Sequence, residues 1–213
     1  MTLINLTDIE KKAYRSTFQD GIWDIFLGLT LLILAVGALL SNRGMPEGRQ
    51  MTVLVGLQVA AAVFFIAGKK RITVPRMGFV KFGPQRKRKI TKSHVVLLGS
   101  VVVGAVAFLV VSLAMRETRA ELLDFMPLAW AVNAMVVFSL LAHYLDCPRL
   151  YGYGVLFALP VPVDAAIKTF AGVNLSPVAF AVPAIVMLAI GGVLLGSFLR
   201  RYPRPERGMS DGN

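Results

Sequence analysis

The chain has 213 residues, of which 56% are hydrophobic, and its formal net charge is +11. Its mean hydropathy of +0.66 is higher than a soluble domain of this length normally has, which excludes a water-soluble core as the main architecture. At about 20 apolar residues for each crossing helix, the chain has room for about six membrane spans joined by short loops. The chain is too short to contain a large soluble catalytic domain in addition to these spans.

The first 20 residues are polar and begin with a helix signal. Thr7-Asp8-Ile9-Glu10 is a capping box, in which the Thr and Glu side chains satisfy free amides of the first helical turn. The segment 1–20 is therefore predicted to form an amphipathic helix on the cytoplasmic side, lying either in the membrane interface or on the protein's own cytoplasmic loop. No cleavage site follows the first apolar run, so this segment is expected to be retained.

Six apolar runs follow. They cover residues 22–40, 51–67, 95–115, 125–145, 150–170 and 178–199. This pattern predicts an all-α integral membrane protein, with a six-helix transmembrane bundle over residues 21–200. The fifth run is the weakest, because it contains Pro160, Pro162, Asp164 and Lys168, and a five-span topology is the alternative.

Basic residues are distributed unevenly between the loops. Ten of the 23 Lys and Arg residues lie between Lys69 and Lys92, flanked by two apolar runs without charge. With six spans and a cytoplasmic N-terminus, 18 basic residues lie in the cytoplasm and five outside. The positive-inside rule therefore predicts a multi-pass protein of a prokaryotic inner membrane, with both termini in the cytoplasm. The tail 201–213 is expected to be disordered.

The basic cytoplasmic loop, residues 69–93, is the most distinctive segment. Arg71–Val74 and Phe79–Phe82 are predicted to be two short strands of a β-hairpin, with the turn beginning at Pro75. Its cations suit an anionic lipid surface or an acidic partner, although such a cluster can also act only as the topology signal. Nucleic acid is not expected, because no aromatic side chains interrupt the basic run. The candidate binding residues are Arg71, Arg76, Lys81, Arg86, Lys87, Arg88, Lys89 and Lys92.

A few polar residues lie within the spans. Asp24 is expected to form a structural ion pair near the cytoplasmic boundary, and Gln58 and Asn133 to bond between helices. Asp164 and Lys168 are four residues apart and can pair on one helical face. In one reading the prolines break this span, and Gln58, Asn133, Asp164 and Lys168 line a transport pathway. In the other, the span is only kinked and Lys168 neutralises Asp164.

Signals for metals, catalysis and association are sparse. His143, Asp146 and Cys147, with His94, form a thin set of candidate ligands for Zn²⁺ or Cu⁺, against interfacial histidines and a buried thiol as the alternative. No catalytic motif and no cofactor site are apparent. Small-residue pairs suggest close helix contacts, either within the chain or in a homo-oligomer. They are Gly192 with Gly196, Gly56 with Ala60, and Ser100 with Gly104.

Together these features predict an accessory or scaffold protein of the membrane that docks anionic lipid or an acidic partner through its basic loop. The competing prediction is a small ion or solute transporter or channel that uses the fifth span.

Overall fold

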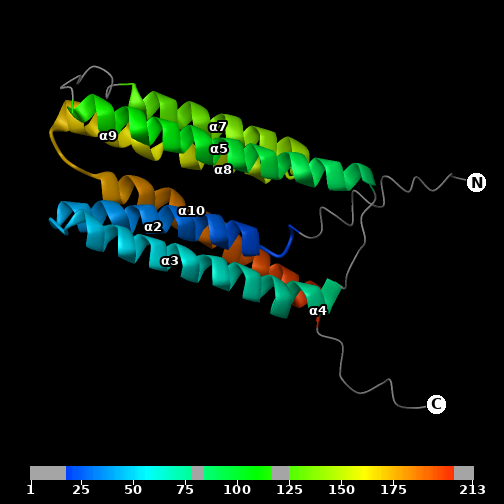
Figure 1. The fold of residues 1–213 in the computed structure, drawn as a ribbon. Helices are drawn as coiled ribbons and strands as arrows, with labels where there is room; N and C mark the ends of the chain where they lie inside the picture. The colour runs from blue at the N-terminus through cyan, green and yellow to red at the C-terminus, as the bar shows by residue number, and fades with distance from the viewer. Residues whose placement is uncertain (1–17, 78–83, 117–124, 204–213) are drawn as a thin grey trace, which may run out of the picture. The chain divides into compact units, whose positions relative to one another are not determined.

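The computed structural model describes residues 18–77, 84–116 and 125–203, and every regular element in these ranges is a helix (Figure 1). In chain order the helices are α2 (Ile22–Asn42), α3 (Glu47–Gly68), the π-helix η1 (Lys69–Thr73), α4 (Val74–Met77), α5 (Pro84–Arg116), α7 (Met126–Leu145), α8 (Arg149–Ala158), α9 (Pro160–Ala171) and α10 (Ser176–Arg201). The chain divides into two compact units. The first comprises Met1–Lys81 and Ala184–Asn213, and the second comprises Phe82–Pro183.

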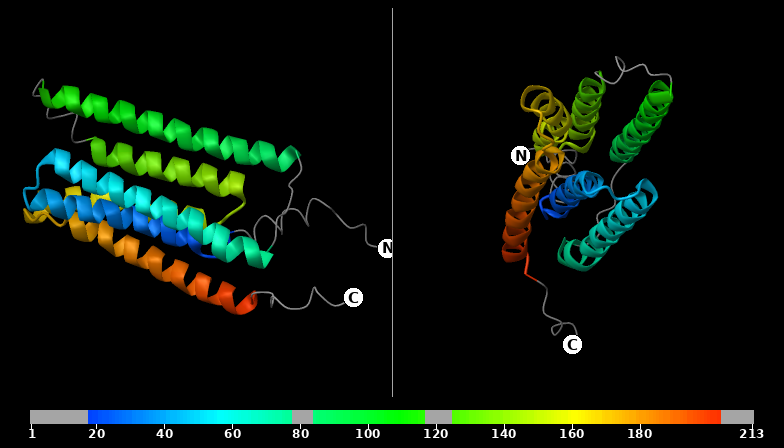
Figure 2. Two further views of the ribbon diagram at one scale, coloured as in Figure 1. Left: turned by 60° about the horizontal axis from the view of Figure 1, so that its bottom comes forward. Right: turned by 90° about the vertical axis from the view of Figure 1, so that its left-hand side faces the viewer.

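The first unit is built on a hairpin of α2 and α3, against which the C-terminal part of α10 packs (Figure 2). Gly21 precedes α2 with a φ of +70°, and a Cβ placed there would lie 2.3 Å from the carbonyl oxygen of Gly191. Both the backbone angle and the close contact therefore require glycine at position 21. A Cβ on Gly68 would meet Ile22 at 3.3 Å. The start of α2, the end of α3 and the C-terminal part of α10 thus lie at one end of this unit.

The second unit is organised around α7 and α8, which run antiparallel. The rings of Phe138 and Phe157 are 4.7 Å apart, and the indole N–H of Trp130 donates to the carbonyl oxygen of Phe157 at 2.8 Å. α7 ends at Leu145 and is followed by Asp146, whose φ of 51° is left-handed, and Pro148 precedes α8. This tight connection returns the chain alongside α7.

Five described helices are long and apolar enough to cross a membrane. They are Ile22–Asn42, Glu47–Arg76, Met126–Leu145, Arg149–Ala171 and Ser176–Arg201. Valines on the outer side of α3 support a lipid environment, because Val55, Val59 and Val63 are 59, 57 and 59% exposed. The predicted all-helical membrane character is therefore supported. The predicted third span lies in α5, which is not among these five, so the six-helix bundle stays a prediction.

The predicted β-hairpin is wrong in its described part. Arg71–Thr73 belongs to η1 and Val74 begins α4, so the first strand is helical; the second, Phe79–Phe82, lies outside the described residues. Thr73 is β-branched and has a strand propensity, but its hydroxyl bonds the buried Asp20 from a helical position. This tertiary contact outweighs the local propensity. The rest of the predicted loop also differs, because α5 already begins at Pro84.

The fifth apolar run is also more continuous than a broken helix. The N–H of Leu159 donates to Val155, and the N–H of Val163 donates to Leu159, so α8 leads directly into α9. Pro160 and Pro162 fall in the first turn of α9, where amides have no partner inside that helix, and they are tolerated there. The bend is local, and Arg149–Ala171 qualifies as one candidate span.

The predicted small-residue contacts differ from those in the structure. A Cβ added at Gly56, Gly104, Gly192 or Gly196 would meet nothing within 4 Å, so these glycines make no close contact in the described part of the chain. Close packing instead occurs at Gly28 against Leu188 and at Gly154 against Phe138. The helix contacts are decided by which face turns inward, which glycine spacing alone does not reveal. Residues 1–17 and 204–213, where a helix and a disordered tail are predicted, lie outside the described residues.

Candidate functional site

Asp20, which precedes α2, is the centre of a buried polar cluster in the first unit. Its side chain is fully buried, and its Oδ2 lies 2.6 Å from the Lys69 ammonium. The Thr73 hydroxyl donates to the same oxygen at 2.5 Å, and the N–H of Ile22 donates to Oδ1 at 3.2 Å. Three donors thus stabilise one buried carboxylate and tie the start of α2 to η1. We call Asp20, Lys69 and Thr73 the Asp20 lock.

Two members of the Asp20 lock, Lys69 and Thr73, are the first and last residues of the π-helix η1. Lys69 and Thr73 are separated by four residues and reach the same carboxylate oxygen. π-helices are rare and occur mostly as single turns inside α-helices, frequently at functional sites. The sequence predicts a structural ion pair at Asp24. Asp24 is 2% exposed and attracts Lys69 electrostatically, but the carboxylate in direct contact with Lys69 is that of Asp20.

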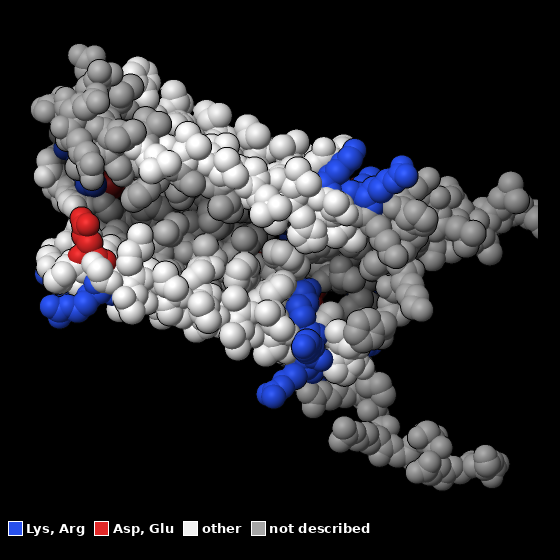
Figure 3. All heavy atoms as spheres, viewed as in Figure 1, with Lys and Arg blue, Asp and Glu red and all other residues white. Residues whose placement is uncertain are grey.

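Beyond the lock, basic side chains are exposed at the end of α3. Lys70 and Arg71 are exposed in η1, whereas Arg76 in α4 is half-buried and its Nε is buried without a hydrogen-bond partner. In the space-filling view, Lys and Arg gather at helix ends and the surfaces between these ends are uncharged (Figure 3). The Asp20 lock therefore uses one cation of this segment and leaves its neighbours available.

In the second unit, the basic start of α5 packs on the end of α7. The ammonium of Lys89 lies 3.6 Å from Oδ2 of Asp146, and that of Lys92 lies 5.9 Å from the centre of the Tyr144 ring. These two lysines are three residues apart and share a helical face, and both are exposed, as is Arg88 next to them. Because this segment is helical and not a hairpin loop, its cations have defined directions. Lys81 and the side chains of Arg86 and Lys87 lie outside the described residues.

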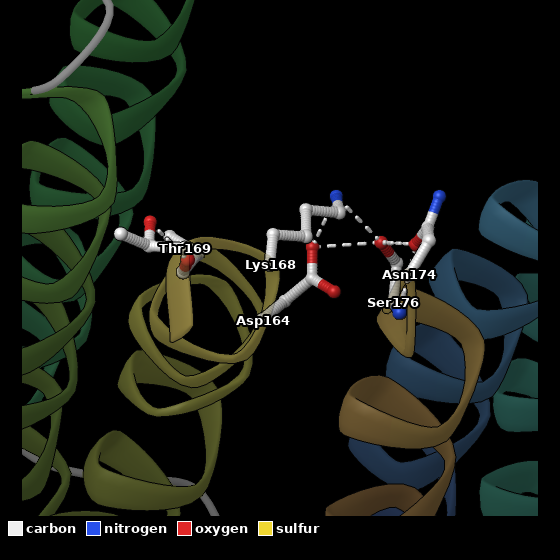
Figure 4. A network of polar contacts seen from close by, with 6 residues as sticks. Asp164, Lys168, Thr169, Asn174 and Ser176 are labelled. Carbon is white, nitrogen blue, oxygen red and sulfur yellow. Dashed lines mark hydrogen bonds and ion pairs between the residues drawn. The ribbon is translucent and has the colours of Figure 1, made fainter. Parts of the chain in front are cut away.

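A second Asp–Lys cluster lies where α9 leads to α10 (Figure 4). The Lys168 ammonium is 2.6 Å from Oδ2 of Asp164 and 3.0 Å from the Ser176 hydroxyl. Ser176 Oγ is in turn 2.7 Å from both Asp164 Oδ2 and Asn174 Oδ1. The predicted i,i+4 pair is therefore formed, but Ser176 and Asn174 were not identified from the sequence. The signal available was the short distance along the chain between the end of one apolar run and the start of the next.

Asp164 itself is only partly satisfied. Its residue is 8% exposed, and its second oxygen, Oδ1, is buried without a hydrogen-bond partner. The side chain of Lys168 is 45% exposed, so the ammonium end of the charge pair is exposed and the carboxylate end is buried. The contact agrees with the alternative in which Lys168 neutralises Asp164, and the position of Lys168 at a membrane surface stays a prediction.

The four residues proposed for a transport pathway are distributed over both units. Gln58 lies in the first unit, where its amide donates to the Thr30 hydroxyl at 3.4 Å between α3 and α2. Asn133, Asp164 and Lys168 lie in the second unit, and Asn133 is half-buried on α7. Gln58 thus makes the kind of interhelical contact that was the structural alternative for it.

The weak metal candidate gains no support from the geometry. Among the residues that the structure describes, no three His, Cys, Asp or Glu side chains form a group that could hold a metal ion. His143 is exposed, Cys147 is buried, and Asp146 ends α7 and faces Lys89. His94 is exposed on α5.

Comparison with known proteins gave no match: no protein-family model, no curated protein and no solved structure is similar to this chain.

Proposed function

We propose that this protein is a multi-pass membrane component that docks anionic phospholipid headgroups with the basic ends of α3 and α5. The observation that supports this most directly is the difference in exposure among the cations. Lys69 is half-buried against Asp20, whereas the other cations described at these ends are exposed, namely Lys70, Arg71, Arg88, Lys89 and Lys92. Cations near an anionic membrane surface each contribute about 1 kcal/mol to binding, so several of them together give a useful affinity.

The topology that goes with this function has six spans, with both termini and the basic segment in the cytoplasm. Single cysteines in a Cys147→Ser background test it. Gly48→Cys places the thiol at the start of α3, and Lys70→Cys places it in η1, just beyond the other end of α3. An impermeant maleimide added to intact cells should label Gly48→Cys only. Labelling of Lys70→Cys from outside would reverse the orientation and remove the inner leaflet as the docking surface.

The lipid preference is tested with delipidated full-length protein, titrated with short-chain phosphatidylglycerol or phosphatidylcholine and followed by native mass spectrometry. We expect tighter binding of the anionic lipid, weakened by salt. Replacing Arg71 and Arg88 with Gln should reduce this preference several-fold. The matched control, Arg43→Gln with Arg49→Gln, removes the same charge at the other helix ends and should change it little. Equal affinity for both lipids would discard lipid docking and leave an acidic partner or a pure topology signal as the role of these cations.

A second candidate function, transport of an ion or a solute, is supported by one observation. Asp164 has a buried carboxylate oxygen without a hydrogen-bond partner, in a segment with two prolines. Carboxylates of this kind inside membrane proteins mark ion and proton pathways. If the function is transport, Asp164→Asn should abolish flux in proteoliposomes, while Glu47→Gln should not. Equal flux in the Asp164→Asn variant and the unmodified protein would exclude this role.

A further inference from the structure

One exposed face of α5 is basic at its start and apolar beyond it. The residues of this face recur at intervals of three and four, so they form one row along the helix. The two basic residues at its start are exposed, and its three valines are 54 to 62% exposed. This face is therefore open in the described part of the chain. We call it the α5 stripe, and it consists of Arg88, Lys92, Val95, Gly99, Val102 and Val106.

The cations at the start of the α5 stripe are accessible and have hydrogen-bond donors to offer. Within the described ranges, neither Arg88 nor Lys92 donates a hydrogen bond to another side chain or carbonyl. The contact of Lys92 with Tyr144, at 5.9 Å from the ring centre, is a cation–π contact. The adjacent Lys89 lies 3.6 Å from Asp146, beyond the hydrogen-bond distance of about 3.2 Å. An anion that reaches this end of α5 thus meets several exposed donors.

The apolar part of the α5 stripe has the length of one leaflet of a bilayer. At about 1.5 Å of rise per residue, residues 95–106 extend over about 16 Å. The hydrocarbon core of a bilayer is about 30 Å thick, so each leaflet contributes about 15 Å. Gly99 interrupts the row of valines, and a Cβ placed there would meet nothing within 4 Å. An acyl chain that begins near Lys92 can therefore approach the helix backbone at Gly99 and follow the row to Val106.

Charge and orientation favour a lipid over a second copy of this helix as the occupant of the α5 stripe. Intervals of three and four residues also suit a contact between two helices. In a parallel pair, however, Arg88 and Lys92 of one copy would lie beside the same cations of the other and repel them. An antiparallel pair would require the two copies to have opposite orientations in the membrane. An anionic phospholipid complements both the basic and the apolar part.

We propose that the α5 stripe binds one anionic phospholipid of the inner leaflet, with the phosphate at Arg88 and Lys92 and an acyl chain along the valines and Gly99. This inference rests on the proposed function and its topology, in which α5 is the third span. It adds one defined site to a general basic surface. The guanidinium and the ammonium donate charge-assisted hydrogen bonds to the phosphate oxygens.

The headgroup contact is tested with full-length delipidated protein, titrated with short-chain phosphatidylglycerol and followed by native mass spectrometry. This measurement gives the affinity of the first lipid that binds. Arg88→Gln with Lys92→Gln should weaken it about tenfold, because both cations at the phosphate are lost. The control Lys70→Gln with Arg71→Gln removes the same charge from exposed positions in η1 and should weaken it no more than about threefold.

The chain contact is tested with Gly99→Leu, which fills the gap between the valines. It should weaken binding of the first lipid about threefold, because the acyl chain can no longer approach the backbone. Gly104→Leu is the matched control, since Gly104 lies on α5 outside the stripe and is equally open. Millimolar glycerol phosphate should not displace the lipid, because it has no chain. Equal affinities of the two leucine variants, or displacement by glycerol phosphate, would overturn the proposal.

Other outcomes separate this inference from the proposed function. Equal losses in the η1 and α5 double variants, with phosphatidylglycerol still preferred over phosphatidylcholine, would overturn the α5 site and leave general docking intact. Absence of this preference in the unmodified protein would overturn both. Gly99→Cys in a Cys147→Ser background should stay monomeric when membranes are oxidised. A disulfide-linked dimer would show that a second copy occupies the stripe and would overturn the lipid site.

Discussion

The two Asp–Lys pairs of this protein have the same distance, 2.6 Å between Nζ and Oδ2, but different surroundings. Asp20 is fully buried and bonds through both oxygens, and its lysine comes from 49 residues away. Asp164 leaves one oxygen without a partner, and its lysine is four residues away and 45% exposed. The first pair therefore joins two helices, whereas the second mostly stabilises one helix and its following turn. Equal distances do not imply equal contributions to stability, because burial and the number of donors set the energy.

Each unit contains one of the two tryptophans, which allows the two clusters to be compared in the same protein. Trp23 lies 4.8 Å from Phe65 in the first unit, and Trp130 bonds Phe157 in the second. Trp130→Phe leaves Trp23 as the reporter, and Trp23→Phe leaves Trp130. Unfolding by dodecyl sulfate in mixed micelles, followed by fluorescence, then gives a free energy for each unit.

The largest effect is expected for Lys69→Met. It leaves the Asp20 carboxylate fully buried without its counter-charge, which costs about 3 kcal/mol when one member of a buried pair is removed. The fluorescence of Trp23 should report this loss. The control Lys70→Met changes the exposed neighbouring lysine and should cost less than about 0.5 kcal/mol. Similar losses in both variants would show that the lock does not join the helices.

A smaller effect is expected for Thr73→Val, which keeps the shape of the side chain and removes the hydroxyl that bonds Asp20. A hydrogen bond to a charged group contributes about 1.5 kcal/mol, and Trp23 fluorescence should show a loss of this size. Thr169→Val is the matched control, because the Thr169 hydroxyl is exposed and bonds only the Ala165 carbonyl of its own helix. If the two variants are equally stable, the donor from η1 is not needed by Asp20.

The smallest effect is expected for Lys168→Met, at about 0.5 kcal/mol in the unit reported by Trp130. The lysine is half exposed, and the Ser176 hydroxyl still reaches Asp164 after the change. Because salt screens exposed pairs, the effect should vanish at 1 M NaCl, whereas the loss in Lys69→Met should persist there. A loss as large as that of Lys69→Met, unchanged by salt, would make the two pairs equivalent and contradict the comparison.

Local sequence patterns were sufficient to predict most of the helices and one of the two Asp–Lys clusters. The first apolar run, 22–40, corresponds to α2, and the run 125–145 differs from α7 by one residue at its start. The spacing of Asp164 and Lys168 predicted their contact, because four residues bring two side chains together on one helix. The prolines of the fifth run were less well understood. Their positions relative to the start of α9 decided whether they break the span, and a run of apolar letters does not show where a new helix begins.

The Asp20 lock could not have been predicted from local sequence patterns. Asp20 was included in the N-terminal segment and Thr73 in a strand, and no spacing rule connects residues 53 positions apart. The basic segment was read as a loop because its charges ended the apolar pattern, but helix formation does not require apolar residues once a tertiary contact holds the turn. The missing hydrogen-bond partner of Arg76 Nε could likewise not be predicted, since it depends on what surrounds the side chain in the folded chain.

By itself, the sequence determined that most of this chain is made of helices apolar enough for a membrane and that its cations gather between two uncharged runs, because both are properties of consecutive residues. The tertiary structure decided which carboxylate takes which cation, because a buried charge selects its partner by position in space. That selection ties η1 to the start of α2 through Asp20.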